Sequence, residues 1–301
     1  MEEKTNPDVL VRCLAGNGQV IASAVTSREV AETSRRLHET SPIATAALGR
    51  LLTAGLLMGD LLRNPTDALT LVVKGDGPIG EILVTSDNSG AVKGYCANSK
   101  VYLPNEANGH LNVAGAVGKG TLTVIKDQGM KDNYNSTVPL HSGEIADDLV
   151  YYYAQSEQIP TAMGLGVLVN PDESVAQAGG FLLQLMPGAT GPVIDRLEEN
   201  RKKIQGVTDL LKEGKTPEGI LDLLLEGLDH TPTERKSVRF HCDCNRERGM
   251  LILKSLGKKE LLSLIDEKKP VEMTCGFCGK KYVYSLAEIE ELASSLSDPK
   301  D

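Results

Sequence analysis

Four of the six cysteines in this 301-residue chain form two close pairs near its C-terminal end. Cys242 and Cys244 are separated by one residue, and Cys275 and Cys278 are separated by two. Zinc prefers four tetrahedral ligands, and structural zinc sites commonly draw their thiolates as two close pairs from separate turns. Glycines within and after the second pair allow the backbone to wrap closely around an ion. The spacing therefore predicts one structural zinc ion bound by these four residues.

The first pair also has redox chemistry of its own. If the metal leaves, Cys242 and Cys244 can close only a very small, strained disulfide ring, and strained disulfides are labile. Zinc holds its cysteine ligands as thiolates, which is the form that oxidants attack. Oxidation that removes two electrons from each pair would release the ion together with the fold that it maintains. A site of four thiolates can therefore sense oxidants.

One histidine and two cysteines outside these pairs could also bind a metal, but we do not expect them to be ligands. His241 stands beside the first pair and could replace one ligand, but four thiolates already complete a tetrahedral shell. We therefore expect it to be a neighbour of the site. Cys13 and Cys96 lie in apolar or strand-like sequence and are predicted to be small core residues.

The remaining motif-like stretches predict no catalytic site. Residues 75–80 match G-x-G-x-x-G, but Pro78 lies inside the match and a strand-like run follows, so we interpret them as a hairpin turn. Asp147 and Asp148 are expected on the solvated face of a first helical turn, where the macrodipole favours negative charge. The isolated histidines lack a nucleophile motif around them. The sequence therefore predicts a protein that is not an enzyme.

Composition and charge restrict the class of protein. The chain is 41% hydrophobic and 24% charged, which is the balance of a soluble globular protein, and its length suggests two domains. The net charge of −9 argues against a nucleic-acid partner. The N-terminal residues lack the apolar segment of a signal peptide, and Arg50 interrupts the apolar stretch 42–62. We expect this stretch to be a buried core helix with close-packed glycines, and the protein to be cytoplasmic with no membrane partner.

The predicted fold class is α+β, in three parts. We expect a mixed α/β core domain with an antiparallel sheet over residues 1–190, a helical linker over 191–232, and a small zinc-binding domain over 233–301. The pattern predicts strands at 68–73, 81–86, 120–127, 164–171 and 175–187, and helices at about 28–40, 42–62 and 143–156.

Three pairs of residues predict where helices begin. These are Ser41 with Pro42, Thr216 with Pro217, and Ser285 with Glu288. Four glycines interrupt the amphipathic linker, and each glycine inside a helix costs up to about 1 kcal/mol relative to alanine. We therefore expect the linker to be only marginally stable, although an ordinary helical hairpin packed on the core fits its composition equally well.

Beyond these patterns, the chain resembles the thirty-three-kilodalton heat-shock protein family, which are redox-regulated bacterial holdase chaperones. The resemblance covers nearly the whole chain in the expected order. It rests on LVVKGDGPIGEILVTSD (71–87), GKGTLTVIKDQG (118–129), YYYAQSEQIPTAMGLGV (151–167), AGGFLLQLMPGA (178–189), FHCDC (240–244) and TCGFC (274–278).

The resemblance implies a redox switch at the four cysteines. In the reduced form, zinc on Cys242, Cys244, Cys275 and Cys278 keeps the protein inactive. Oxidation by peroxide with heat, or by hypochlorite, would pair Cys242 with Cys244 and Cys275 with Cys278. The metal leaves, the zinc domain and the linker unfold, and apolar surface is exposed. The activated protein forms a homodimer and holds unfolding client proteins without ATP.

Two other functions are consistent with parts of the sequence. A zinc-ribbon nucleic-acid-binding protein would use the lysine pairs near the second cysteine pair, although acidic residues flank most of them. A thiol–disulfide oxidoreductase would use Cys275 and Cys278, but such enzymes usually carry C-x-x-C at a helix start in a thioredoxin-like unit. We expect neither.

Overall fold

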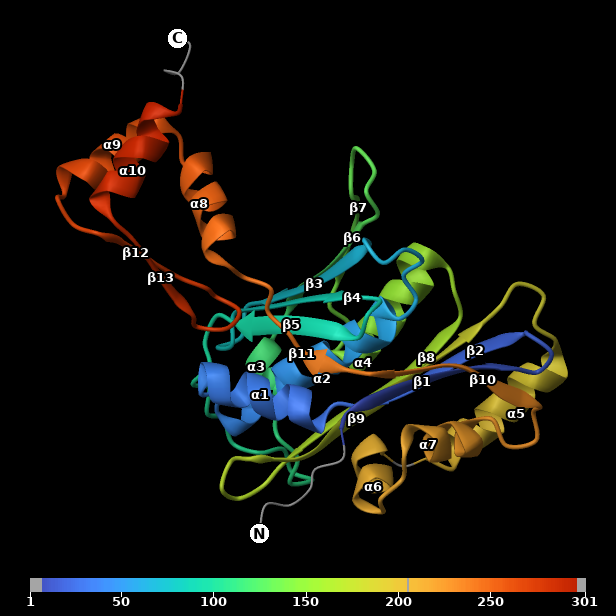
Figure 1. Ribbon diagram of the computed structural model, residues 1–301. Helices are drawn as coiled ribbons and strands as arrows, with labels where there is room; N and C mark the ends of the chain where they lie inside the picture. The colour runs from blue at the N-terminus through green and yellow to red at the C-terminus, as the bar shows by residue number, and fades with distance from the viewer. Residues whose placement is uncertain (1–6, 205, 297–301) are drawn as a thin grey trace. The chain divides into compact units, whose positions relative to one another are not determined.

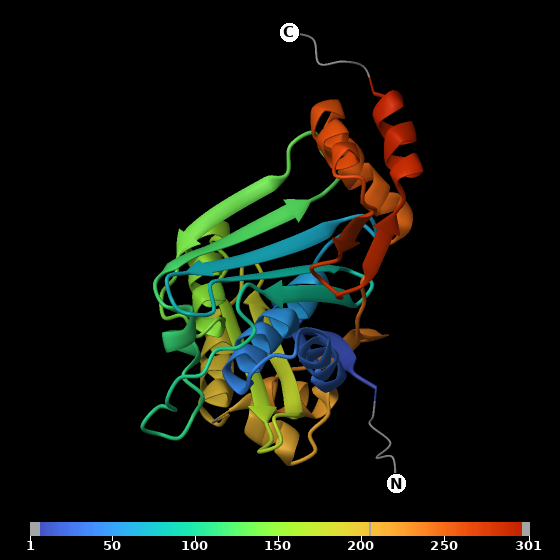
Figure 2. The ribbon, with the colours of Figure 1, turned by 90° about the vertical axis from the view of Figure 1, so that its left-hand side faces the viewer.

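The computed structural model describes residues 7–204 and 206–296, and it divides into two compact units. The first, which we call the core unit, ends at His241, and the second, the cysteine unit, begins at Cys242 (Figures 1 and 2). The core unit contains β1 (Val9–Ala15), β2 (Val20–Thr26), α1 (Arg28–His38), α2 (Pro42–Gly59), β3 (Ala68–Gly75), β4 (Glu81–Asp87), β5 (Ala91–Cys96), α3 (Val113–Val117), β6 (Gly120–Asp127), β7 (Tyr134–Pro139), α4 (Ala146–Tyr152), the π-helical turn η1 (Tyr153–Glu157), β8 (Thr161–Val169), β9 (Val175–Leu185), α5 (Gly191–Lys202), α6 (Val207–Lys212), α7 (Pro217–Leu224), β10 (His230–Ser237) and β11 (Arg239–Phe240).

The strands of the core unit form two sheets. The five-stranded sheet has the order β10-β1-β2-β9-β8 and is antiparallel throughout. The six-stranded sheet has the order β11-β5-β4-β3-β6-β7, and all of its pairs are antiparallel except β11 with β5. The mixed α/β architecture with antiparallel sheets confirms the predicted fold class.

Helix α2 lies between the two sheets and contacts strands of both. Its glycines permit this close approach, as the sequence predicts. A Cβ atom on Gly49 would lie 2.9 Å from Val167 of β8, and one on Gly55 would lie 2.8 Å from Val84 of β4. Among the described residues, α2 is the one helix long and apolar enough to span a membrane, and 89% of it is buried inside the fold. It is the buried core helix that the sequence predicts.

The five-stranded sheet carries helices on both faces. Side chains on one face of the sheet pack in the apolar cluster around α2. Side chains on the opposite face pack in a separate apolar cluster with α5, α6 and α7, which we call the linker helices. The buried amide of Asn200 on α5 donates to the carbonyls of Leu224 and Glu226, at 3.1 and 2.8 Å, and so connects α5 to the end of α7. The linker helices therefore pack on the core as a layer of their own.

Several sequence-based predictions of local structure are confirmed. Residues 75–80 form the turn between β3 and β4, where a Cβ atom on Gly75 would lie 1.8 Å from the carbonyl oxygen of Val117. The Thr216 side chain caps α7 by accepting from the amide of Gly219. Cys13 and Cys96 are buried, with 2% and 8% of their surface exposed.

The predicted start of α2 at Pro42 is confirmed but lacks a side-chain cap, and the predicted solvation of Asp148 is wrong. Ser41 occupies the N-cap position of α2 but makes no side-chain cap, because its hydroxyl instead donates to the carbonyl of Val101 at 2.6 Å. Asp148 is buried and not solvated, and its carboxylate accepts backbone N–H groups that include those of His141 and Ile145, at 2.7 and 3.0 Å. This carboxylate pairs with amides of the loop that precedes α4, which is why it is held inside the fold.

The cysteine unit is small and has its own core. It contains α8 (Arg246–Ser255), α9 (Lys258–Asp266), β12 (Val271–Thr274), β13 (Lys281–Tyr284) and α10 (Leu286–Ser294). Its core consists of Leu253, Leu261, Tyr284, Ile289 and Ala293 with half-buried neighbours. Ser285 and Glu288 form the predicted capping box at the start of α10. The predicted three-part division at 190/191 and 232/233 stays a prediction, since the compact units themselves meet at 241/242.

Candidate metal centre

The second cysteine pair lies in the turn of a β-hairpin. Strands β12 and β13 pair from Val271 with Tyr284 to Thr274 with Lys281, so the intervening residues must reverse direction tightly. The amide of Cys275 donates to the carbonyl of Lys280 at 2.9 Å, and the amide of Gly279 donates to the carbonyl of Cys275 at 2.8 Å. Gly279 has a φ of +69°, in the left-handed region that glycine adopts without strain. The hairpin thus directs both thiols to one side of the turn.

The first pair precedes helix α8. Asn245 caps this helix by accepting from the amide of Arg248 at 2.8 Å, which fixes the direction in which the chain leaves Cys244. Arg248 also forms an ion pair with Asp243, the residue between the two cysteines. The capped start of α8 therefore fixes the position of the first pair, and the hairpin turn fixes the position of the second.

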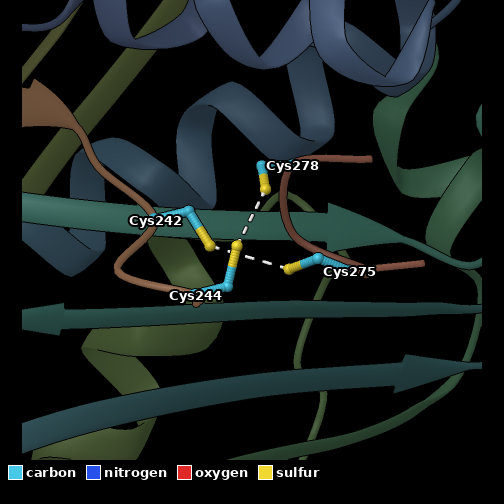
Figure 3. A group of neighbouring side chains, drawn as sticks. All are labelled: Cys242, Cys244, Cys275 and Cys278. Atoms are coloured by element: carbon cyan, nitrogen blue, oxygen red, sulfur yellow. Dashed lines mark hydrogen bonds between the residues drawn. The ribbon is translucent and has the colours of Figure 1, made fainter. Parts of the chain in front are cut away.

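The four thiols meet in one cluster, with all Sγ atoms within 4.8 Å of one another (Figure 3). The Sγ atoms of Cys242 and Cys275 are 3.7 Å apart, and those of Cys244 and Cys278 are 3.4 Å apart. A regular tetrahedron with Zn–S bonds of about 2.3 Å has sulfur–sulfur edges of about 3.8 Å. A disulfide bond is only about 2.05 Å long, and all six cysteines are free thiols. The spacing and the donor type therefore fit a four-coordinate zinc site.

A family model described as "Hsp33 protein" matches residues 8–285. The chain belongs to the Hsp33 family. It is 49% identical to the 33 kDa chaperonin of Clostridioides difficile over 290 residues, which cover 96% of this chain and 99% of that protein. It is 46% identical to the 33 kDa chaperonin of Agathobacter rectalis over 285 residues, covering 95% and 99%. The crystal structure of the 33 kDa chaperonin from Thermotoga maritima superposes with a TM-score of 0.88 at 37% identity, covering 96% of this chain and 98% of that one.

In this Hsp33-family chain the electrostatic environment differs between the two thiols of the first pair. Burial raises the pKa of Cys242 to about 12. Burial also acts to raise the pKa of Cys244, but hydrogen bonds from the Tyr282 hydroxyl and the neighbouring thiols outweigh it and lower that pKa to about 7. The Tyr282 hydroxyl lies 3.2 Å from Sγ and 2.9 Å from the carbonyl oxygen of Cys244. These hydrogen bonds favour the thiolate form of Cys244, which is the form that binds a metal.

A second set of contacts holds the elements of the site together. The Arg246 guanidinium donates to the carbonyl of Val283 and to Glu288, both at 2.6 Å, and lies over the Tyr284 ring. The ion pair with Arg246 lowers the pKa of Glu288 to about 2. The Tyr284 hydroxyl in turn donates to the carbonyl of Arg246 at 2.8 Å. These contacts connect the start of α8 to β13 and α10, and so connect the first cysteine pair to the second.

Sequence reasoning located the four thiols but not their supports. His241 lies outside the thiol cluster, at the end of the core unit, where its amide donates to the carbonyl of Val92 at 2.9 Å. The roles of Tyr282, Tyr284 and Arg246 were not predicted. The alternation in KYVY places the two tyrosines on one face of a strand, but nothing in the sequence says which backbone or thiol they meet.

Proposed function

We propose that this Hsp33-family chain is a redox-regulated, ATP-independent holdase chaperone that acts in the cytoplasm and is not an enzyme. In the reduced form, one zinc ion per chain bound by Cys242, Cys244, Cys275 and Cys278 keeps it inactive. The observation that carries the proposal is the tetrahedral spacing of four free thiols in a unit with a small core. The family match favours this function over a nucleic-acid-binding ribbon or an oxidoreductase.

The oxidative step is a rearrangement of the thiol cluster. An oxidant such as peroxide or hypochlorite takes two electrons from each pair, and disulfides form between Cys242 and Cys244 and between Cys275 and Cys278. The sulfur–sulfur hydrogen bonds in the thiol cluster join members of opposite pairs. The proposed pairing replaces these contacts, and a sulfur in a disulfide is no longer a thiolate ligand, so a bound metal cannot be retained.

Loss of the metal ligands removes a large part of the stability of the cysteine unit. Among its described residues, up to Leu296, the core of this unit has five buried hydrophobic side chains, and regions of this size usually need a metal or a disulfide to remain folded. Bound zinc contributes its binding free energy to folding, because the unfolded chain has no preformed site. Release of the ion is therefore expected to unfold this unit.

The surface offered to clients is the face of the five-stranded sheet beneath the linker helices. Its strands contribute Val9, Val11, Cys13, Ala15, Val20, Ala22, Ala24, Phe181 and Leu183. The linker helices and their turns cover these residues with Val193, Leu197, Ile204, Val207, Leu211, Ile220, Leu221, Leu224 and Leu225. Separation of the two layers would expose an apolar patch on each, and large exposed apolar patches bind other proteins. One patch can hold an unfolding client while the other supports dimer formation.

The test measures bound zinc, free thiols and suppression of client aggregation on one sample, before and after peroxide at raised temperature. We expect oxidation to remove the zinc and four thiols and to switch on suppression. A variant carrying Cys13→Ala and Cys96→Ala should respond in the same way, because these thiols lie outside the cluster. If the zinc departs while aggregation is unaffected in the parent chain, the chaperone proposal fails.

A further inference from the structure

Residues 230–241, which we call the strap, connect the linker helices to the cysteine unit and join both sheets of the core. Strand β10 pairs with β1 from Val9 with Ser237 to Ala15 with His230, as the edge strand of the five-stranded sheet. Two residues later, β11 pairs with β5 at the edge of the six-stranded sheet (Figure 1). Between them Val238 is buried, and its amide donates to the carbonyl of Asp8 at 3.0 Å.

A buried ion pair fixes the strap to the helix between the sheets. The ammonium nitrogen of Lys236 lies 2.7 Å from Oδ1 of Asp60, the C-cap residue that follows α2, and donates to the carbonyl of Asn88 at 2.8 Å. Asn88 lies in the turn between β4 and β5. The Asp60 side chain is 1% exposed and that of Lys236 is 17% exposed. One lysine of the five-stranded sheet thus contacts both the C-cap of α2 and a turn of the six-stranded sheet.

Asp60 also pairs with a second positively charged side chain, so these residues form a network of ion pairs. Nη1 of Arg12 on β1 lies 3.1 Å from Oδ2 and 2.8 Å from the carbonyl oxygen of Asp60. Its Nη2 lies 3.8 Å from the carboxylate of Glu234 on β10. Without Lys236, the buried carboxylate of Asp60 would keep its contact with Arg12 but lose the partner of its Oδ1, and weakening a buried ion-pair network is destabilising. The strap therefore resists separation from β1 more than an ordinary edge strand does.

The strap also holds the last linker helix. Nε2 of His230 lies 3.0 Å from Asp222 of α7, and Nε of Arg235 lies 3.1 Å from Glu218 at the start of the same helix. The linker helices leave the five-stranded sheet after β9 and return to it at β10, so both ends of residues 186–229 are anchored to one sheet. Unfolding of the cysteine unit alone leaves both anchors in place.

We propose that unfolding spreads from the cysteine unit to the linker helices through release of the strap, and that the Lys236–Asp60 contact is the latch that retains it. This inference rests on the proposed function, in which the linker unfolds after metal loss. Because the strap separates Cys242 from α7 along the chain, the linker helices remain anchored until β10 leaves β1. When it leaves, α7 loses its C-terminal anchor and both ion pairs to β10 together.

The experiment is amide hydrogen exchange on the full-length, reduced, zinc-loaded protein. We compare the parent chain with Lys236→Met, which keeps the length of the side chain and removes its charge. The matched control is Lys100→Met, which removes the same charge from an exposed ion pair with Glu39. In Lys236→Met we expect exchange to become at least about tenfold faster in residues 230–241 and in 217–225 together, with the zinc content unchanged. The control should match the parent.

The inference is overturned if exchange in residues 230–241 rises in Lys236→Met while 217–225 stay at the parental rate. A second measurement needs no variant: the parent chain is followed during peroxide treatment. If residues 217–225 lose protection while 230–241 remain protected, the linker unfolds without the strap and the inference is wrong. Neither measurement involves a client, so a chain that suppresses aggregation after oxidation with its strap still protected would refute the strap and leave the proposed function standing.

Discussion

Leu221→Ala in α7 tests whether the linker helices cover the apolar sheet face that we assign to clients. Leu221 is 1% exposed and belongs to the same buried cluster as Cys13 on β1. Replacing a buried leucine by alanine costs about 2–5 kcal/mol, because packing is lost and a cavity remains. The substitution weakens the contact of the linker helices with the sheet and leaves the thiol cluster unchanged.

Cys13 reports the opening directly. Only 2% of its surface is exposed, and burial, assisted by the carboxylates of Asp222 and Glu218, raises the pKa of its thiol. It therefore reacts with an alkylating reagent only when the linker helices separate from the sheet. If the substitution shifts that opening equilibrium by its lower limit of about 2 kcal/mol, labelling of Cys13 accelerates about 30-fold, since about 1.4 kcal/mol corresponds to a factor of ten.

The assay is peptide mapping by mass spectrometry of the reduced, zinc-loaded protein after timed alkylation. Leu223→Ala is the matched control, since Leu223 lies on the same helix but is only half-buried and outside the apolar cluster. Labelling of Cys13 at the parental rate in Leu221→Ala, or equal acceleration in both variants, would refute the assignment of this face.

Three further predictions concern the cysteine unit and the core unit separately. In the cysteine unit, a Cβ atom on Gly249 would lie 1.9 Å from the Tyr284 hydroxyl, so Gly249→Ala should destabilise this unit by about 1–3 kcal/mol. The same substitution should weaken zinc binding, measured by competition with a chromogenic chelator. Removing zinc with a chelator under reducing conditions should abolish exchange protection in residues 246–294 while strands β3, β4 and β6 keep theirs. In the core unit, burial raises the pKa of Asp8 from 3.8 to about 6, so the folded chain binds a proton more tightly than the unfolded chain does. The free energy of unfolding of the core unit should therefore fall as the pH rises from about 4 to about 6, and Asp8→Asn should flatten this step in chemical denaturation.

The structure also explains why some parts of the fold were readable from the sequence and others were not. The strands β3, β4, β6, β8 and β9 and the helices α1 and α2 were predicted because their apolar residues repeat with a clear period. The strands β2 and β7 were not predicted, and neither were the strands of the strap and of the cysteine unit. The sequence around Cys13 in β1 and Cys96 in β5 was recognised only as apolar or strand-like. Strand β10 reads HTPTERKS, a polar run with a proline, and it is a strand only because β1 offers it an edge.

The roles of charged residues depended still more on the fold. Asp60 follows an apolar helix, and Lys236 lies in a charged run near the other end of the chain, so nothing local relates them. The same holds for Asp148, which resembles an ordinary first-turn carboxylate until the preceding loop folds back and surrounds it with amides. Whether such a charged side chain is solvated or buried depends on contacts with distant segments, and a local sequence pattern does not encode these contacts.

By itself, the sequence determined the chemistry of this protein, because metal ligation depends on ligand type and spacing along the chain. Four cysteines in two close pairs, with a glycine where the turn needs a positive φ, are sufficient to predict the thiol cluster that the structure contains. Only the tertiary structure decided what surrounds that cluster and what the linker covers. The hydrogen bond from Tyr282 to Cys244, the apolar face beneath α5 to α7 and the latch between Lys236 and Asp60 all join segments that meet only after the sheets have formed. Their physical basis is non-local packing, and for that reason they were found in the fold and not in the sequence.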